Sequence, residues 1–365
     1  MKKNRVSRIR RKFIKRSDNT SESSAETVEE PLLNFEEVLK QSVTPHLLLG
    51  NGFSMAYDPK RFSFTTLLES AVTSGVMKED CEIYKIFKKL ATADFERVMR
   101  SLEDAEGIVE VYAGDPILRK KLKNDGSTLK EHLVKIVTNN HPEKSTSLTV
   151  AEKTACVNFL KKFNKIYTLN YDLLLYWATM QDQAENFTDG FGNTEDSLHE
   201  GYVVYKNSGS QAMNVHYLHG ALHYFDAGDE IIKKTYVNTD ICLIDQITES
   251  LSKNIYPVFI SEGTSEQKKT KILHSAYLNH CYKSLRSIGG DIVIFGTTLK
   301  ENDKHILDAL LESKAKNIYL GVSRSSAADH IKYAIEVHNK NSDQKHQKNL
   351  YLYDYRTVNV WGKTL

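Results

Sequence analysis

The sequence predicts an α/β protein with a Rossmann-like parallel sheet, and this prediction depends on two observations. First, short apolar segments bounded by turn residues recur along the chain, rich in leucine, β-branched and aromatic residues, as in strands buried on both faces. Second, helical patterns alternate with these segments, which is the order that builds a parallel sheet. The expected strands cover residues 46–50, 166–170, 215–219, 256–260, 291–296, 317–322 and 349–355.

Two helices are expected near the C-terminal strands. In the stretch 269–290, apolar side chains recur every four residues from Leu273 through Tyr277 and Cys281 to Leu285, before a pair of glycines. The second helix follows Asn302 and Asp303, either of which is a candidate N-cap. Asp303 is therefore interpreted as a helix cap rather than as a catalytic acid.

Two long intervals interrupt the alternation of strands and helices. Residues 60–150 are largely helical in pattern, and residues 181–255 are mixed and contain polar loops. We interpret both as insertions into one domain that covers residues 35–365. Residues 1–34 are expected to be a disordered tail, because they offer almost nothing to bury.

The charge of that tail differs from the charge of the rest of the chain. Residues 1–16 carry nine basic residues and no acid, although the net charge of all 365 residues is only +2. The remainder is therefore mildly acidic, which gives no reason to expect a nucleic-acid groove in the folded part. A solvated extension is the simpler interpretation of the tail; the alternative is a docking arm for nucleic acid, a membrane surface or an acidic partner.

Composition excludes several further classes. The sequence is 40% hydrophobic, but it has no apolar run of about 18 residues and no signal-peptide pattern, so a spanning helix and secretion are not expected. Its four cysteines lie far apart and form no CxxC pair, which argues against a disulfide scaffold and a structural zinc module. We expect a cytoplasmic protein.

A glycine loop follows the first expected strand. Gly50 and Gly52 permit a tight turn and allow backbone N–H groups to approach a pyrophosphate closely. The third glycine of the dinucleotide fingerprint is missing, and Pro59 soon ends any helix that follows. A simple turn is therefore the alternative.

Polar residues also follow two other strands. Asn170 and Asp172 come after the second strand, and His219 ends the third, where Gly220 lets the chain turn away. Since the carboxyl ends of parallel strands line the ligand crevice, we expect these side chains to meet in one site. The alternatives are that Asn170 bonds a nearby backbone, that Asp172 caps the next helix, and that His219 is structural.

Taken in order along the chain, these motifs resemble those of the sirtuin-like superfamily, in particular the bacterial sirtuin-like NAD hydrolases of antiphage defence. Sirtuins read G-A-G-I-S, T-Q-N-I-D, L-H-G and G-T-S-L. The chain instead reads Gly-Asn-Gly-Phe-Ser at residues 50–54, Thr-Leu-Asn-Tyr-Asp at 168–172, Leu-His-Gly at 218–220 and Gly-Thr-Thr-Leu at 296–299. The four-cysteine zinc module and the G-I-P-D-F-R segment of deacetylating sirtuins are absent from the sequence, which puts deacylation in doubt.

The resemblance implies cleavage of the bond between nicotinamide and ribose in NAD, which is a substrate here. Asp172 would bind the nicotinamide carboxamide, Asn170 the ribose or the attacking water, and His219 would act as general base, a role that suits its unperturbed pKa of about 6.5. Apart from the resemblance, Glu262 or its loop is a candidate cover for the site, only because of its position between a strand and a helix. The expected cofactor-binding residues are Gly50, Asn51, Gly52, Phe53, Ser54, Thr168, Tyr171, Gly296, Thr297 and Thr298.

No metal site is expected. His216, His219 and His223 recur at a spacing of three, but residues three apart on a strand face opposite sides, and Gly220 interrupts a helix.

Three functions remain open from the sequence. The first is an NAD hydrolase that depletes NAD in antiphage (abortive infection) defence. The second is another NAD-consuming transferase, a deacylase or an ADP-ribosyltransferase. The third is a non-catalytic nucleotide-binding sensor. The resemblance further implies a separate activating partner, such as an ATPase, a nucleotide-sensing enzyme or an Argonaute-type protein. We expect a homo- or hetero-oligomer in which the insertion at residues 60–150 forms an interface.

Overall fold

The computed structural model describes residues 31–180, 187–193, 201–206, 213–235, 241–253, 255–260 and 264–363. The basic stretch 1–16 and the loop residue Glu262 lie outside these ranges. No helix in the described part of the chain is long and apolar enough to cross a membrane.

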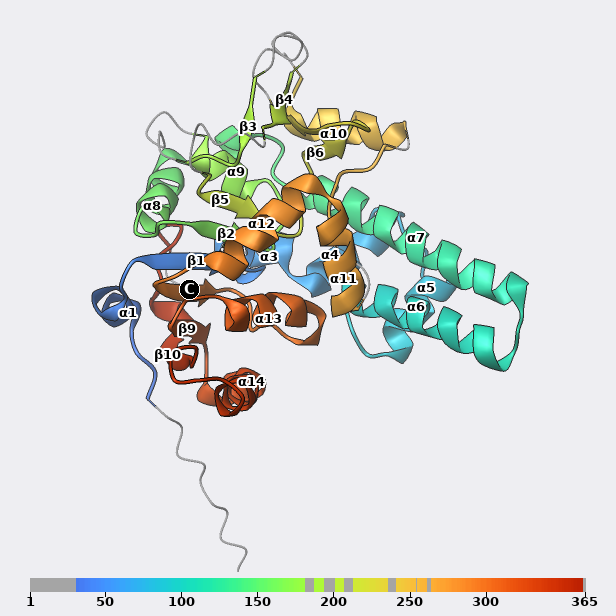
Figure 1. Cartoon of the computed structure of the whole chain (residues 1–365). Coiled ribbons are helices and arrows are strands. Elements are labelled where there is room, and N and C mark those ends of the chain that lie inside the picture. Colours follow the sequence, from blue (N-terminus) through green and yellow to red (C-terminus); the bar gives the residue numbers. More distant parts are fainter. Residues whose placement is uncertain are drawn as a thin grey trace, which may run out of the picture.

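A six-stranded parallel sheet forms the centre of the protein, so the predicted Rossmann-like α/β fold is confirmed (Figure 1). Its strands are β1 (Pro45–Leu49), β2 (Ile166–Thr168), β5 (Val215–Tyr217), β8 (Asp291–Phe295), β9 (Asn317–Val322) and β10 (Asn349–Asp354). Their spatial order is β10-β9-β8-β1-β2-β5. The chain thus adds β2 on one side of β1 and β8 on the other, and this reversal of order is where α/β sheets bind ligands.

Six of the seven predicted strands belong to this sheet, and the prediction for residues 256–260 is wrong. That segment forms only a single antiparallel bridge, between Phe259 and Gly220. Its backbone bonds the loop beyond β5 instead, since the N–H groups of Val258 and Ile260 donate to the carbonyls of Tyr224 (2.7 Å) and His219 (2.8 Å). The segment therefore braces the loop that carries His219.

Helices cover both faces of the sheet. In the strand register Tyr167 pairs with Leu48 and Phe295 with Leu49. These are successive residues of β1, so the side chains of Tyr167 and Phe295 point to opposite faces. The hydroxyl of Tyr167 lies 2.9 Å from that of Ser284 on α12 (Ala276–Ser287), whereas the Phe295 ring packs on Phe159 of α8 (Val150–Leu160). The other helices around this sheet are α1 (Phe35–Gln41), α2 (Gly52–Tyr57), α9 (Leu174–Thr179), α11 (Ser265–His274), α13 (Lys304–Glu312) and α14 (Asp329–Lys340).

The helix expected within residues 269–290 is interrupted. Ser275 has an extended backbone, and its hydroxyl accepts a hydrogen bond from the N–H of Leu278, so it caps α12 and separates it from α11. Tyr277, Cys281 and Leu285 are buried on α12 as the spacing predicts, but Leu273 lies on α11 and is exposed. A serine cap within an apolar repeat thus ends one helix and begins another.

The interval between β1 and β2 is helical, as predicted. Its long helices α6 (Phe95–Tyr112) and α7 (Pro116–Asn140) form a hairpin that projects away from the sheet in Figure 1. Asp94 and Asp115 cap these helices through their carboxylates. The shorter helices are α3 (Pro59–Phe62), α4 (Phe64–Thr73) and α5 (Glu82–Lys89).

The second inserted interval contains a small antiparallel sheet in the order β3-β4-β7-β6, with β3 (Phe191–Gly192), β4 (Tyr202–Tyr205), β7 (Ile231–Lys234) and β6 (Tyr224–Asp226). The helix α10 (Leu243–Ser252) follows it. Short 3₁₀ helices complete the description: η1 (Ser145–Ser147), η3 (Glu301–Asp303), η4 (Ser325–Ala328) and η5 (Tyr355–Thr357).

Candidate active site

A pocket of about 250 Å³ opens at the carboxyl ends of β1, β2, β5 and β8, and we call it the polar pocket. Asn170, Asp172 and His219, which are distant in sequence, all line it. The inserted helices supply its outer wall. The other residues in its lining that the sequence singled out as cofactor-binding are Gly50, Asn51, Tyr171, Gly296, Thr297 and Thr298.

A chain of hydrogen bonds joins Asn170, Ser54 and Asp172 at the base of this pocket. The side-chain N–H of Asn170 donates to Ser54 Oγ at 2.9 Å, and the Ser54 hydroxyl donates to Asp172 Oδ2 at 2.5 Å. Because the amide nitrogen of Asn170 is engaged in this way, its side-chain carbonyl is left to face a ligand. The three residues therefore fix one orientation of the Asn170 amide.

Asp172 has a structural bond as well. Its Oδ1 accepts from the backbone N–H of Leu174 at 2.9 Å, at the start of α9, so the capping alternative is partly realised. Burial raises the pKa of Asp172, while the bonds from Ser54 and Leu174 oppose that rise by stabilising the carboxylate. Both carboxylate oxygens thus already accept a bond within the chain.

Thr168 supports Asn170 from behind. Its hydroxyl accepts a hydrogen bond from the Asn170 backbone N–H at 3.0 Å, and its side chain is fully buried. Thr168 does not line the polar pocket, so it positions Asn170 instead of contacting a cofactor. Tyr171 does line the pocket, and its ring packs against Phe259, 5.2 Å away between centroids.

His219 is placed in the pocket by the turn that follows it. Gly220 has a φ of +76°, and a Cβ there would come within 2.1 Å of the carbonyl oxygen of Val258. Only glycine fits both that backbone conformation and that close approach. The side chain of His219 is thus directed at the pocket by a turn that no other residue type can make.

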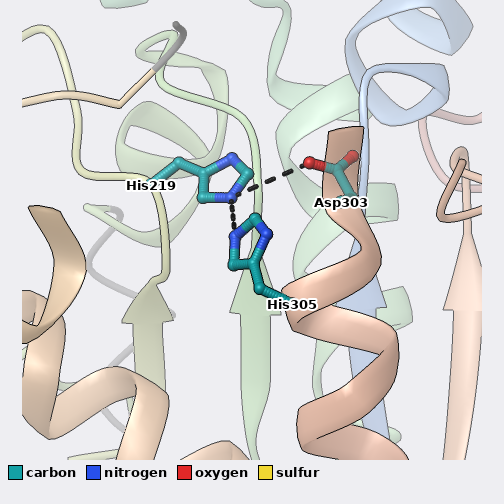
Figure 2. A group of neighbouring side chains, drawn as sticks. All are labelled: His219, Asp303 and His305. Atoms are coloured by element: carbon teal, nitrogen blue, oxygen red, sulfur yellow. Dashed lines mark hydrogen bonds and ion pairs between the residues drawn. The ribbon is translucent and has the colours of Figure 1, made fainter. Parts of the chain in front are cut away.

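The imidazole of His219 pairs with a second histidine that the sequence did not suggest. Its Nε2 lies 3.1 Å from Nε2 of His305, on the first turn of α13, and the two rings are nearly parallel (Figure 2). Ser265 Oγ accepts the backbone N–H of His305 at 2.6 Å and lies 3.2 Å from its Nδ1. Burial lowers the pKa of His219 well below its usual value and that of His305 to about 3, and Lys268 adds to both effects. Both rings are neutral at pH 7.

Asp303 faces the same histidine. It occupies the N-cap position of α13, but its side chain makes no capping hydrogen bond. Its Oδ1 lies 3.9 Å from Nε2 of His219 and is buried without a hydrogen-bond partner in the described chain. Asp303 therefore occupies the N-cap position that the sequence predicts. Its side chain does not cap the helix and instead faces the polar pocket.

Glu96, Lys268 and Asp303 form a charged cluster beside these rings. Nζ of Lys268, a fully buried side chain, lies 2.7 Å from Glu96 and 3.7 Å from Asp303. Burial raises the pKa of Glu96 to about 7, although Lys268 opposes this shift. For Lys268, burial alone would lower the pKa, but the neighbouring carboxylates outweigh it and raise the pKa.

The glycine loop after β1 has a different role from the one predicted. The N–H groups of Gly50 and Gly52 donate to the carbonyls of Phe295 (2.9 Å) and Gly296 (2.8 Å), so they are not free to cradle phosphate. A Cβ on Gly52 would lie 2.4 Å from Cα of Gly296. The glycines let the loops after β1 and β8 pack in contact, and both loops line the pocket.

Two other residues expected to bind a cofactor are internal. Phe53 is fully buried, its ring lies 4.9 Å from that of Trp361, and its carbonyl accepts the Trp361 indole N–H at 2.9 Å. Ser54 is also fully buried and acts through Asn170 and Asp172. Neither lines the pocket, because α2 begins at Gly52 and turns these side chains toward the core.

A second, larger cavity of about 690 Å³ adjoins the first, and we call it the apolar pocket. The two share Asn51, Phe64, Gly296, Thr297 and Thr298. The second extends past the carboxyl ends of β8 and β9, where its lining includes Met55, Tyr57, Val322, Ala327 and Tyr355. Together they form a continuous depression across the point where the strand order reverses.

Sequence reasoning missed the charged wall of the polar pocket. Glu96, Lys268 and His305 come from helices, and motifs at strand ends give no indication of them. The only available signal was polar residues on otherwise apolar helix faces, such as His305 beside Ile306. His219, Asp303 and His305 also place three metal-ligating atoms within 4.8 Å of one another, whereas the trio His216, His219 and His223 does not.

Comparison with protein-family models matches residues 47–361 to one described as a domain of unknown function (DUF4917). A search of curated proteins found no match. The matched region contains the sheet apart from the first two residues of β1, and the lining of both pockets apart from Lys363.

Proposed function

We propose that this chain, which belongs to the DUF4917 family, is a bacterial cytoplasmic NAD hydrolase that releases nicotinamide and ADP-ribose. One observation carries the proposal: Asn170 and His219 line a small polar pocket that continues into a larger apolar one at the reversal of strand order. Such a site suits a dinucleotide with one reactive and one passive half. The order of the motifs, similar to that of sirtuin-like enzymes, supports the same conclusion.

The shape of the two pockets suggests how NAD would lie. The nicotinamide riboside would occupy the polar pocket, and the adenosine the apolar pocket. The pyrophosphate would cross the shared region near Thr297 and Thr298, whose side chains carry hydroxyl donors. Backbone N–H groups of Gly50 and Gly52 have no part in this proposal, because they are already bonded within the chain.

The reaction needs little acid catalysis. In NAD the nicotinamide ring is already a cation, so the bond between the ribose C1′ and the ring nitrogen breaks with its electron pair moving to nitrogen, and a neutral ring departs. A water oxygen then bonds to C1′, and its proton passes to a base. One positioned base is therefore sufficient, and such assistance typically contributes about 10²–10⁴-fold.

His219 supplies this base in the proposal through Nδ1, although burial lowers the pKa of the ring and makes it a weaker base than the free imidazole expected from the sequence. Of the paired Nε2 atoms, one must carry the proton. If His219 donates Nε2–H to His305, then His305 donates Nδ1–H to Ser265, and Nδ1 of His219 keeps its lone pair. That nitrogen has no hydrogen-bond partner in the described chain, so it is free to accept a proton from water.

Asn170 would hold the ribose or the attacking water with its side-chain carbonyl. Its orientation is set through Ser54, which is set in turn by Asp172. Asp172 lines the pocket too, so contact with the nicotinamide carboxamide stays part of the proposal. Its two bonds within the chain give it an additional positioning role.

A separate activating partner also remains a proposal. The end of α6 exposes Ile108, Val111 and Tyr112, and the start of α7 exposes Ile117, each with more than half of its surface accessible. Exposed apolar groups gathered at the tip of a projecting hairpin suit a protein contact. We therefore expect the isolated chain to be weakly active, and Val111→Asp with Ile117→Asp to prevent assembly without unfolding the chain.

The direct test is to incubate the purified full chain with NAD and to follow nicotinamide and ADP-ribose by chromatography, alone and in lysate with the products of neighbouring genes. Stoichiometric release of both products is the expected result. Activity that survives unchanged in His219→Ala and Asn170→Ala would refute the site. No release under either condition would refute the activity.

A further inference from the structure

We propose that His219, Asp303 and His305 form a binding site for a divalent transition-metal ion of the zinc type. The ligand atoms would be Nε2 of both histidines and Oδ1 of Asp303 (Figure 2). Nothing in the motif set suggests this site, since only His219 belongs to a motif.

The spacing of the three atoms fits such an ion closely. The two Nε2 atoms are 3.1 Å apart, Nε2 of His219 is 3.9 Å from Oδ1 of Asp303, and all three atoms lie within 4.8 Å of one another. With metal–ligand bonds of about 2.0–2.2 Å, neighbouring ligand atoms in a tetrahedral zinc site are about 3.3–3.6 Å apart. Side-chain shifts of about 1 Å would therefore bring the three atoms to bonding distance of one ion.

The described residues offer the buried Oδ1 of Asp303 only a long ion pair. Oδ1 of Asp303 makes no hydrogen bond in the described chain, and its nearest cation is Nζ of Lys268 at 3.7 Å. Leaving such an atom unpaired in the interior costs about 1–3 kcal/mol. A bound cation would satisfy it directly.

The local charge also permits a cation. Asp94, Glu96 and Asp303 line the polar pocket with three carboxylates, and Lys268 is the ammonium group in contact with Glu96 and Asp303. The positive charge of Lys268 opposes metal binding, because its Nζ lies 3.7 Å from Oδ1 of Asp303, but its bond to Glu96 at 2.7 Å partly neutralises that charge. With Asp172 and Lys300, which also line the pocket, four carboxyl groups face two ammonium groups.

Two imidazoles and one carboxylate select the metal class. This ligand set suits Zn²⁺ and similar ions, whereas Mg²⁺ and Ca²⁺ prefer oxygen ligands alone. Ser265 would orient the ring of His305 through Nδ1, as a supporting partner of a ligating histidine usually does. The fourth coordination position would open to the polar pocket, which His219 and Asp303 line.

Metal binding would inhibit the activity proposed above, and this consequence rests on that proposed function. A metal on Nε2 of His219 leaves the ring proton on Nδ1, so the nitrogen that would accept a proton from water becomes a donor. The metal-bound and catalytically competent forms of His219 thus exclude each other.

The test uses the full chain, freed of metal with a chelator that is then removed by dialysis. Calorimetric titration with ZnCl₂ should show one saturable site, and Co²⁺ should give the visible absorption of a tetrahedral complex. His305→Ala and Asp303→Asn should each weaken zinc binding at least tenfold. His346→Gln, which removes an exposed histidine far from the pocket, should bind as the wild type does. Thermal melts establish that each variant is folded.

The outcomes separate the two proposals. Absence of a saturable site in the wild type, or equal affinity in folded Asp303→Asn, would overturn the metal site. Zinc binding at this site without nicotinamide release, in metal-free or zinc-loaded protein, would sustain the metal site and overturn the NAD hydrolase. Nicotinamide release that zinc suppresses in the wild type but not in Asp303→Asn would support both.

Discussion

The two adjoining pockets differ sharply in what surrounds them. The polar pocket is about 250 Å³ and contains Asp94, Glu96, Asp172, His219 and Asp303. The apolar pocket is about 690 Å³, and Lys363 is its sole charged residue among the described ones. Titratable groups are thus gathered in the smaller space, where burial raises the pKa values of Glu96, Asp172 and Asp303 and lowers that of His219. This difference suggests that the reaction would take place in the polar pocket, while the apolar pocket would bind the unreactive part of the ligand.

The largest expected effect comes from the polar pocket. His219→Ala should lower kcat for nicotinamide release by about 10²–10⁴-fold, because it removes the proposed base. The affinity for ADP-ribose, measured by calorimetry, should change little, since most of that ligand would lie elsewhere. His346→Gln should keep the wild-type rate. Equal losses of kcat and of ADP-ribose affinity would show that His219 serves binding.

Acid should weaken the scaffold beneath the polar pocket. His141 accepts the backbone N–H of Leu173 through Nε2 at 3.0 Å, and burial lowers its pKa to about 4. In the unfolded chain His141 binds a proton with a pKa near 6.5. The contribution of neutral His141 to stability is therefore complete above pH 6.5 and is lost as pH falls toward 4. Over this range the free energy of unfolding falls by about 3 kcal/mol through His141.

His141→Gln measures this contribution. Denaturant unfolding between pH 6.5 and pH 4.5 should show a shallower fall in stability for this variant than for the wild type. His346→Gln provides the matched control at an exposed histidine. Identical pH dependence in His141→Gln and the wild type would contradict the assignment.

The glycines in the loops after β1 and β8 should contribute to stability by packing, and not to binding by phosphate contacts. Gly52→Ala places a Cβ 2.4 Å from Cα of Gly296, so we expect a loss of about 1–3 kcal/mol in the free energy of unfolding. Gly107→Ala, on α6 with nothing within 4 Å of the new atom, should stabilise the protein by about 0.5–1 kcal/mol. Denaturant titration of both variants gives the comparison, and a neutral Gly52→Ala would refute the tight packing.

The smallest expected effect distinguishes the roles of the two pockets. Ala327→Trp would fill part of the apolar pocket and should raise KM for NAD about tenfold, while kcat stays close to the wild-type value. With nicotinamide riboside, which lacks the adenosine half, the variant and the wild type should react alike. A rise in KM with both substrates would mean that the apolar pocket does not hold the adenosine.

The sheet and three of its strand ends could be predicted because the signals are local. Apolar runs identify strands, and polar residues at their carboxyl ends identify a crevice, so Asn170, Asp172 and His219 were found. The segment 256–260 has the same composition as a strand, and only its contacts with the loop beyond β5 distinguish it.

Other parts of the site depend on tertiary contacts that no pattern encodes. Whether a loop N–H is free depends on its neighbours, and the N–H groups of Gly50 and Gly52 bond the loop after β8. Asp303 has the residue type and position of a cap, yet its side chain turns away from the helix end. His305 and Lys268 enter the site region from helices that approach only after folding.

A crystal structure of the His219→Ala chain with NAD would show whether one dinucleotide spans both pockets. We expect intact NAD with its nicotinamide ribose beside Asn170 and its adenine between Met55 and Ala327. Well-ordered NAD bound at another surface, or with the adenine in the polar pocket, would contradict it.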